Sequence, residues 1–172
     1  MNKTLKNNVI QWSKDRGIVP NGKPLTQFAK LMSEFSEIFE ALRLNSEEKL
    51  IDAIGDVQVV LINLSELLKL QTKKDVEFIK IDSINSINEL AEKICNIGDM
   101  IIKNDYNEAQ NLISESYKLL NGFSNSKNID SDYALKIAYN EIKDRKGFLT
   151  PEGNFVKSTD PRYEEILKKY KK

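Results

Sequence analysis

The sequence predicts an all-α protein, a bundle of about six helices with a small hairpin near the end of the chain. Apolar residues recur at helical spacing along most of the 172 residues, and patterns typical of strands are few. The chain has only four prolines and seven glycines, and they chiefly mark the ends of these segments. A chain of this length is expected to form one domain over residues 1–172, burying roughly 70% of its extended-chain surface.

The first half of the chain contains three expected helices. The first covers about 4–16 and is followed by the stretch GIVPNGKP, whose prolines and glycines favour a loop. A second helix begins near Thr26. Asn45 or Ser46 caps the third, which runs to about Leu70. The second half of this third helix is apolar nearly all round, so we expect it to be the buried centre of the bundle.

The rest of the chain is expected to hold further helices and the hairpin. Residues 71–85 favour either a short strand or an irregular link, and the pattern does not decide between them. The stretch 121–130 is predicted to be a loop, because it is rich in Asn, Gly and Ser. Residues 146–157 predict a hairpin, followed by a short charged helix. Apolar spacing predicts the remaining helices, one that includes Leu90 to Ile101 and others at about 106–121 and 131–145.

Charge and residue usage exclude several classes of function. Lys and Arg number 26, as do Asp and Glu, and this zero net charge argues against sequence-independent binding of nucleic acid. No apolar run reaches the roughly 18 residues that span a bilayer, and the start of the chain has no signal-peptide pattern, so we expect a cytoplasmic protein without membrane partners. The absence of histidine excludes Ser-His-Asp and Cys-His catalysis and His-ligated zinc. The single cysteine, Cys95, is expected to be a small buried apolar residue.

Two pairs of carboxylates stand on helices that otherwise have apolar faces. Glu34 and Glu37 are three residues apart, and Asp52 and Asp56 are four apart, so each pair shares a helix face. A short connection makes the two helices antiparallel neighbours, which can bring both pairs to one level. Four carboxylates this close repel unless divalent cations lie among them, and oxygen ligands alone favour Mg²⁺ or Mn²⁺. A solvated charged face is the alternative, but it does not explain why Asp56 adjoins a continuous apolar run.

Gly55 stands beside Asp56 inside a helix, where glycine costs about 1 kcal/mol relative to alanine. We therefore expect another segment of the chain to approach closely there. The stretch AIGDVQVV at 53–60 also has an echo, NIGDMIIK at 96–103, with Glu89 and Glu92 upstream. We interpret this echo as a coincidence in an isoleucine-rich chain. A decayed second acidic site is the alternative.

The acidic pattern resembles that of the MazG-like nucleoside triphosphate pyrophosphohydrolases, a family of all-α enzymes. EFSE at 34–37 followed by AIGDV at 53–57 is similar to their E-x-x-E…E-x-x-D motif, and QWSKDRGI, TQFAKLMSE and AYNEIKDRKG with GNFVK resemble compact MazG-related proteins of bacteria and phages. The resemblance covers roughly residues 8–64 and 133–157, and leaves 71–130 as a helical insertion without a match. At one position the family has Glu and this chain has Ala53, so we transfer that ligand role to the adjacent Asp52.

The resemblance implies hydrolysis of a nucleoside triphosphate between its α and β phosphates, giving the monophosphate and pyrophosphate. It also implies that the carboxylates hold Mg²⁺, for which Mn²⁺ can substitute, and that Glu37 or Glu34 accepts the proton of the attacking water. Glu40 is either an outer ligand or a surface residue. The implied metal ligands are Glu34, Glu37, Asp52 and Asp56.

Positive groups must meet the phosphates that metal leaves uncovered. Lys30 precedes Glu34 by one helical turn, and a basic cluster ends the last core helix. The alternative for that cluster is an ordinary basic helix C-terminus that complements the helix dipole. Trp12 is expected either to stack on the base or to belong to the core. The candidate substrate-binding residues are Trp12, Lys30, Asn140, Lys143, Arg145 and Lys146.

The expected partners are the nucleoside triphosphate and further copies of this chain, as a homodimer or a dimer of dimers. The resemblance implies helices shared between copies, and the apolar helix at 57–70 is expected to need more cover than the short helices supply. A helical binding or scaffold protein that keeps the fold without the chemistry is the alternative, which Ala53 makes possible. The sequence predicts no base or sugar preference.

Overall fold

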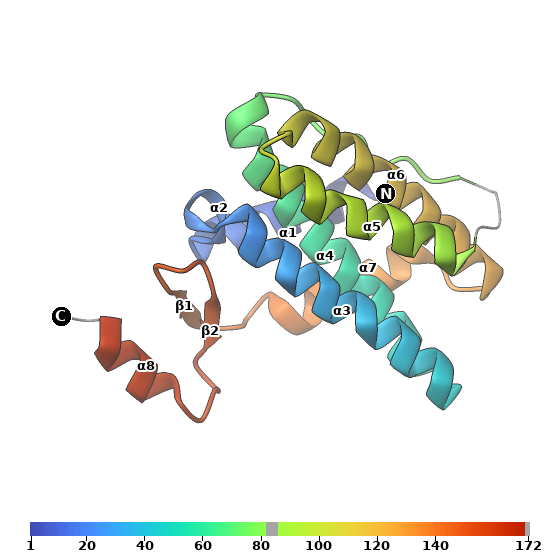
Figure 1. Cartoon of the computed structure of the whole chain (residues 1–172). Coiled ribbons are helices and arrows are strands. Elements are labelled where there is room, and N and C mark those ends of the chain that lie inside the picture. Colours follow the sequence, from blue (N-terminus) through green and yellow to red (C-terminus); the bar gives the residue numbers. More distant parts are fainter. Residues whose placement is uncertain (82–85, 171–172) are drawn as a thin grey trace.

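The computed structural model describes residues 1–81 and 86–170, and these residues confirm the predicted all-α class. The helices gather around one apolar core, and a two-stranded hairpin lies at one end of the molecule (Figure 1). The elements are α1 (Lys3–Asp15), α2 (Ile18–Asn21), α3 (Pro24–Leu44), α4 (Glu47–Thr72), α5 (Ile87–Ile102), α6 (Tyr106–Ser126), α7 (Ser131–Ile142), β1 (Gly147–Leu149), β2 (Phe155–Lys157) and α8 (Tyr163–Tyr170).

α4 is the buried centre of the fold, as predicted. Every residue from Val57 to Leu68 is buried except Glu66. Because apolar side chains leave α4 in all directions, it needs cover on every side, and α1, α2, α3, α6 and α7 all pack against it. The expectation that a second copy is needed to cover this helix is therefore wrong. The chain supplies the cover itself.

The predicted antiparallel pairing of α3 and α4 is confirmed. Asn45 ends α3 in the left-handed conformation (φ 49°), and the Ser46 hydroxyl accepts a hydrogen bond from the backbone N–H of Lys49 at 3.4 Å. With so short a connection, residues at equal distances from the turn lie at the same level on the two helices. Glu34 lies eleven residues before Asn45 and Asp56 eleven residues after it.

The predicted loop at 121–130 is wrong in its first half, because α6 continues to Ser126. Asn121 and Ser124 are buried, and both side chains have partners. The amide of Asn121 donates to the Ser131 hydroxyl at 2.8 Å, and the Ser124 hydroxyl donates to the carbonyl of Ile129 at 2.8 Å. These tertiary hydrogen bonds hold a polar stretch in a helix that its composition does not favour.

Residues 73–81 form an irregular link and not a strand, whereas 82–85 of the same prediction lie outside the described residues. Side chains of α6 satisfy the backbone of this link in place of a neighbouring strand. Gln110 donates to the carbonyl of Lys74 at 2.9 Å, and Ser114 donates to that of Glu77 at 2.7 Å.

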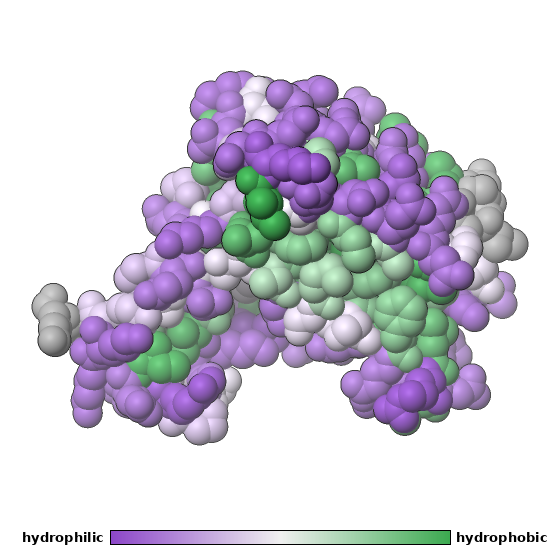
Figure 2. Space-filling model, in the orientation of Figure 1, coloured by the Kyte–Doolittle hydropathy of each residue, from purple (hydrophilic) through white to green (hydrophobic). Residues whose placement is uncertain are grey.

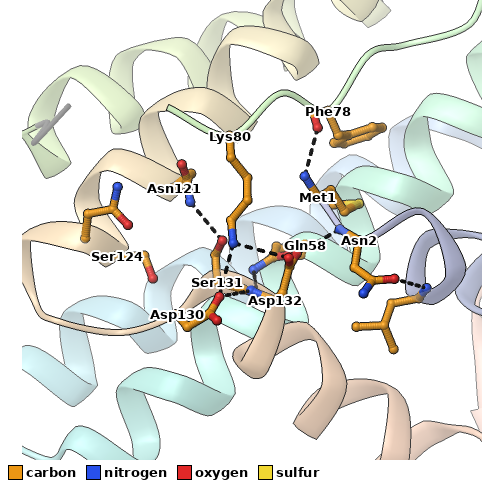
Figure 3. A network of polar contacts seen from close by, with 12 residues as sticks. Met1, Asn2, Gln58, Phe78, Lys80, Asn121, Ser124, Asp130, Ser131 and Asp132 are labelled. Carbon is orange, nitrogen blue, oxygen red and sulfur yellow. Dashed lines mark hydrogen bonds and ion pairs between the residues drawn. The ribbon is translucent and has the colours of Figure 1, made fainter. Parts of the chain in front are cut away.

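Lys80 ties the same link to the start of α7 (Figure 3). Its ammonium lies 3.2 Å from a carboxylate oxygen of Asp130 and 3.2 Å from one of Asp132. Asp130 also caps α7 by accepting from the backbone N–H of Asp132 at 2.8 Å, and Gln58 of α4 donates to the carbonyl of Ser131 at 2.9 Å. α7 is thereby positioned on α4, although it ends at Ile142, three residues before the predicted end.

The predicted hairpin is confirmed, with β1 and β2 antiparallel and Phe148 opposite Val156. Its turn contains Gly153 at φ 88°, a conformation that favours glycine. The Thr26 hydroxyl of α3 donates to the carbonyl of Glu152 at 2.9 Å, and the hydroxyl of Tyr170 in α8 donates to the Glu152 carboxylate at 2.7 Å. The turn is thus held between α8 and the start of α3.

Apolar side chains gather on the face that α3 and α5 present in Figure 2. Large apolar side chains exposed on these helices include Leu25, Phe39 and Ile102. Cys95 of α5 is also exposed, which contradicts its predicted burial. It follows the buried Ile94 by one residue and so points away from the helix face that enters the core.

Candidate functional site

The carboxylates predicted on α3 and α4 lie on the facing sides of the two helices. Glu34 is buried, with 5% of its surface exposed, and Glu37 is exposed. Asp52 and Asp56 are half-buried. Ala53, at the position where the resemblance expects Glu, lies in the core, so a carboxylate there would face apolar side chains.

Asp56 has the most perturbed carboxyl group of the cluster. Burial, followed by the negative charges of Glu34, Asp52 and Glu141, raises its pKa to about 7, and the Lys30 charge opposes the shift. A carboxyl group with such a pKa exchanges its proton near neutral pH. It is also the kind of group that a nearby cation returns to the ionised form.

Glu37 and Asp52 shift in the same direction. Burial raises the pKa of Glu37 and the neighbouring Glu34 raises it further, while Lys30 opposes the shift. Burial also raises the pKa of Asp52, followed by the charges of Glu141 and Glu34, with Arg145 opposing. The four predicted carboxylates therefore lie close enough to influence one another's ionisation.

Glu141 of α7 is a fifth member, which the sequence reasoning missed. It stands in the stretch AYNEIKDRKG that carries the family resemblance, so that stretch was the available signal. Its carboxylate accepts a hydrogen bond from the Arg145 guanidinium at 3.0 Å. Its charge reaches both Asp52 and Asp56 because Gly55 lets the backbone of α7 approach α4. The expected close approach at Gly55 is thus confirmed.

A cavity of about 250 Å³ opens beside the buried carboxylates. Glu34 and Asp56 lie in its wall together with Lys30 and Arg145. The remaining wall is apolar, aromatic or uncharged over most of its extent, with Lys157 as a further cation. That part is formed by Trp12, Ile18, Thr26, Gln27, Val59, Val60, Asn63, Ile142, Gly153, Asn154, Phe155 and Lys157.

The hairpin forms one side of this cavity. Asn154, Phe155 and Lys157 come from the stretch GNFVK, and the ring of Phe155 meets that of Trp12 edge to face at a centroid distance of 6.3 Å. A Cβ atom on Gly153 would lie 2.9 Å from the backbone nitrogen of Lys23. The glycine therefore permits the close contact that places these side chains against α1 and α3.

The structure brings together only some of the predicted substrate-binding residues. Trp12, Lys30 and Arg145 line the cavity, and Trp12 also belongs to the core. Lys30 forms an ion pair with Glu34 within α3. Asn140, Lys143 and Lys146 are exposed and do not line the cavity, and the ammonium of Lys143 lies 3.2 Å from the side-chain oxygen of Asn140. Glu40 is exposed and pairs with Lys49 at 2.9 Å, as a surface residue would.

Arg16 is a second residue that sequence reasoning missed. Its guanidinium donates to the carbonyls of Lys143 and Arg145, at 2.8 Å and 2.7 Å, and lies 5.2 Å from the ring centroid of Trp12. It thus satisfies backbone acceptors just beyond α7 and ties that end of the helix to α1. One of these carbonyls belongs to Arg145, which lines the cavity.

The donor set at the cavity consists of carboxylate oxygens, which suit Mg²⁺ or Mn²⁺ in chemistry and charge. Burial is the first cause of the raised pKa values of Asp56, Asp52 and Glu37, and neighbouring carboxylates are the second; a bound cation would oppose both. Over residues 1–81 and 86–170, however, no three acidic side chains converge as a ready ligand set. The echo at 96–103 adds none, because Asp99 is exposed and pairs with Lys103 at 2.6 Å.

Comparison with known proteins finds similarity over part of the chain. A segment is 39% identical over 59 residues to a protein of Haemophilus phage HP1 (strain HP1c1), described as "Uncharacterized 18.2 kDa protein in rep-hol intergenic region". The similarity covers 34% of this chain and 36% of that protein, so this chain matches about a third of the relative's length. No family model and no solved structure matches the chain. No described helix is both long and apolar enough to cross a membrane.

Proposed function

We propose that this protein hydrolyses a nucleoside triphosphate to the monophosphate and pyrophosphate with Mg²⁺, and that its helices form the all-α NTP pyrophosphatase fold. The supporting observation is the mixed lining of one cavity. Glu34, Asp56, Lys30 and Arg145 supply acidic and basic groups to its wall, and most of the rest is aromatic, apolar or amide, with Lys157 as a further cation. Such a cavity suits a ligand with a polyanionic end and a flat heterocyclic end.

The carboxylates would hold the metal, with Glu34 and Asp56 in the cavity wall and Glu37 and Asp52 one turn away on the same two helices. When bound, Mg²⁺ neutralises phosphate charge and lowers the pKa of a coordinated water. Glu37 accepts the proton of the attacking water, because its raised pKa brings it nearer to neutral pH and its exposure lets it pass the proton to solvent. Lys30 and Arg145 stabilise the charge of the departing pyrophosphate.

A helical nucleotide-binding or scaffold protein without catalysis is the second candidate. Two observations favour it: Ala53 removes one carboxylate of the family motif, and Lys30 already neutralises Glu34. In that case the cavity would bind a nucleotide and leave it intact.

The deciding experiment measures pyrophosphate release from a panel of NTPs and dNTPs, with and without Mg²⁺. Hydrolysis in ¹⁸O-labelled water then locates the attacked atom, and we expect the label in the monophosphate and none in the pyrophosphate. Label in free orthophosphate, with a diphosphate as co-product, would identify a γ-cleaving enzyme and end this proposal. Binding without release of any product would favour the scaffold.

The proposal places the enzyme in the cytoplasm as a homodimer or a dimer of dimers. The family resemblance supports this assembly, as do the large apolar side chains exposed on α3 and α5, whereas α4 is covered within one chain.

A further inference from the structure

Two residues of the cavity wall each carry a buried polar atom that lacks a hydrogen-bond partner. The atoms are the indole nitrogen of Trp12 and the side-chain oxygen of Asn63, and neither finds a partner among the described residues. The two residues are only 7% and 3% exposed. A buried polar atom without a partner destabilises the fold, so its presence in a binding cavity suggests that a ligand completes the pair.

The two atoms are complementary in their chemistry. The indole N–H of Trp12 can only donate, and the Asn63 oxygen accepts. Gln27, which is 6% exposed, adds a second amide to the same wall. An amide offers both a donor and an acceptor, so this part of the cavity can match an edge that carries an N–H beside an acceptor.

The helices place these amides at a defined distance from the carboxylates. Asn63 follows Asp56 by seven residues on α4, and Gln27 precedes Glu34 by seven residues on α3. Seven residues are close to two helical turns, or about 10 Å along the axis, so both amides lie on the helix faces that carry the carboxylates.

The amides also share one level of the bundle. Gln27 lies eighteen residues before Asn45 and Asn63 eighteen residues after it, just as Glu34 and Asp56 are both eleven residues away. One cavity therefore has a carboxylate level and, two turns further, an amide level. This separation corresponds to the reach of a nucleoside from its phosphate to the far edge of its base.

We propose that Asn63 and the indole N–H of Trp12 read the hydrogen-bonding edge of a nucleobase and thereby set the base preference of the site. This assignment rests on the proposed function, because it assumes that the phosphates of the nucleotide bind at the carboxylate level. Asn63 accepts from a ring or exocyclic N–H of the base, and Trp12 donates to the neighbouring carbonyl or ring nitrogen. Phe155 and the two valines beside Asn63, Val59 and Val60, supply apolar contact for the base.

The test uses Asn63→Leu, which keeps a similar branched shape but removes the polar atoms, and Trp12→Phe, which removes the N–H but keeps an aromatic ring. Pyrophosphate release is measured for the four NTPs and four dNTPs with Mg²⁺. We expect the parent protein to prefer one base at least tenfold and each variant to lose most of that preference, because a site with unpaired polar groups rejects the wrong base. Ser116→Ala is the matched control, since it removes a buried unpaired hydroxyl away from the cavity and should leave the preference intact.

Thermal unfolding separates base reading from a structural role. Asn63→Leu removes an unpaired polar atom and should melt at the same temperature as the parent or higher, while its base preference falls. A variant that melts at the parent temperature and keeps the parent's base preference would overturn the inference, because water alone then satisfies these atoms. Equal use of all bases by the parent would overturn it as well.

A binding measurement keeps this inference distinct from the proposed function. Calorimetric titration with the four free nucleosides requires neither Mg²⁺ nor hydrolysis. Selective binding of one nucleoside that Asn63→Leu abolishes would support base reading even if no triphosphate is hydrolysed. Hydrolysis without selective binding or selective turnover would leave the proposed function standing and overturn the role of Asn63.

Discussion

A Cβ atom on Gly55 would lie 2.3 Å from the carbonyl oxygen of Ala134, so α4 and α7 meet there backbone to backbone. This contact stands next to Asp56 and brings the Glu141 charge to it. The packing of two helices and the charge of the candidate site therefore depend on the same glycine.

Gly55→Ala should destabilise the protein. Overpacking against the fixed backbone of α7 costs about 1–3 kcal/mol, which exceeds the gain of about 1 kcal/mol from the better helix propensity of alanine. We expect a net loss of up to about 2 kcal/mol in the free energy of unfolding, measured by urea denaturation.

Gly98→Ala is the matched control for that variant. A Cβ atom there would lie 2.3 Å from the ring edge of Phe28, a side chain that can move, whereas the backbone at Ala134 cannot. We expect its free energy of unfolding to fall by less than that of Gly55→Ala. Equal losses for the two variants would mean that α7 adjusts and that the close approach at Gly55 has no special weight.

The stability of the metal-free protein should fall as the pH rises from about 4 to about 7. Asp56 has a pKa of about 7 in the folded protein and about 4 when unfolded, so the folded state binds more protons in this window. Asp56→Asn should flatten this dependence and, at pH 8, stabilise the metal-free protein by on the order of 2–4 kcal/mol. Urea denaturation in EDTA across this range measures both effects.

The control for the pH experiment is Asp99→Asn, which removes an exposed carboxylate paired with Lys103. Its pH dependence should follow that of the parent protein. A parent protein whose stability is constant between pH 4 and 8, or rises, would show that Asp56 is ionised throughout and that the carboxylates do not share one electrostatic environment.

Mg²⁺ or Mn²⁺ should raise the melting temperature at pH 8. Binding to the native state stabilises it by linkage, and at this pH Asp56 is ionised and available. The response should be lost in Glu37→Gln and in Asp56→Asn, and kept in Asp99→Asn. If only Asp99→Asn loses it, the metal belongs to the second acidic stretch with Glu89 and Glu92.

Much of the fold was predictable because it depends on local patterns. The apolar spacing identified α4 as the central helix. Ser46 correctly predicted the start of α4, and the turn glycine correctly predicted the hairpin. The helical end of α6 was not predictable, since Asn121 and Ser124 are held there by partners distant in sequence or across a turn. Cys95 is exposed because it lies one residue after Ile94 and therefore on another side of α5. The apolar pattern of the sequence is too broad to predict this difference.

For the site, spacing along one helix and across the short connection between α3 and α4 was informative, and spacing to more distant elements was not. The i, i+3 and i, i+4 pairs placed Glu34, Glu37, Asp52 and Asp56 in one electrostatic group. The contributions of Glu141 and Arg16 were not predicted, because each of these residues acts on groups that lie far away from it in the sequence. Lys143 and Lys146 are close to Arg145 in the sequence. These three residues follow the end of α7, however, and only Arg145 lies in the cavity wall.

The protein should be at least a dimer at micromolar concentration, with the face of α3 and α5 in the interface. That face gathers exposed apolar side chains, which are expensive to leave in water unless they meet a partner (Figure 2). Phe39→Glu should shift the mass measured by light scattering toward the monomer. A parent protein with monomeric mass would remove the expected assembly.

Arg145→Ala should slow turnover without changing the atom that water attacks. Arg145 lies in the cavity wall with Asp56 and is proposed to stabilise the charge of the leaving pyrophosphate, so we expect kcat/KM to fall about tenfold or more. Lys143→Ala should have a smaller effect, because Lys143 is exposed outside the cavity, and Lys136→Ala, an exposed lysine earlier on the same helix, serves as the control. In ¹⁸O-labelled water all three variants should still place the label in the monophosphate, since Arg145 and Lys143 are expected to act on the departing charge, and Lys136 does not line the cavity. Label that moves to the pyrophosphate in Arg145→Ala would mean that this guanidinium also aligns the α-phosphate with the attacking water.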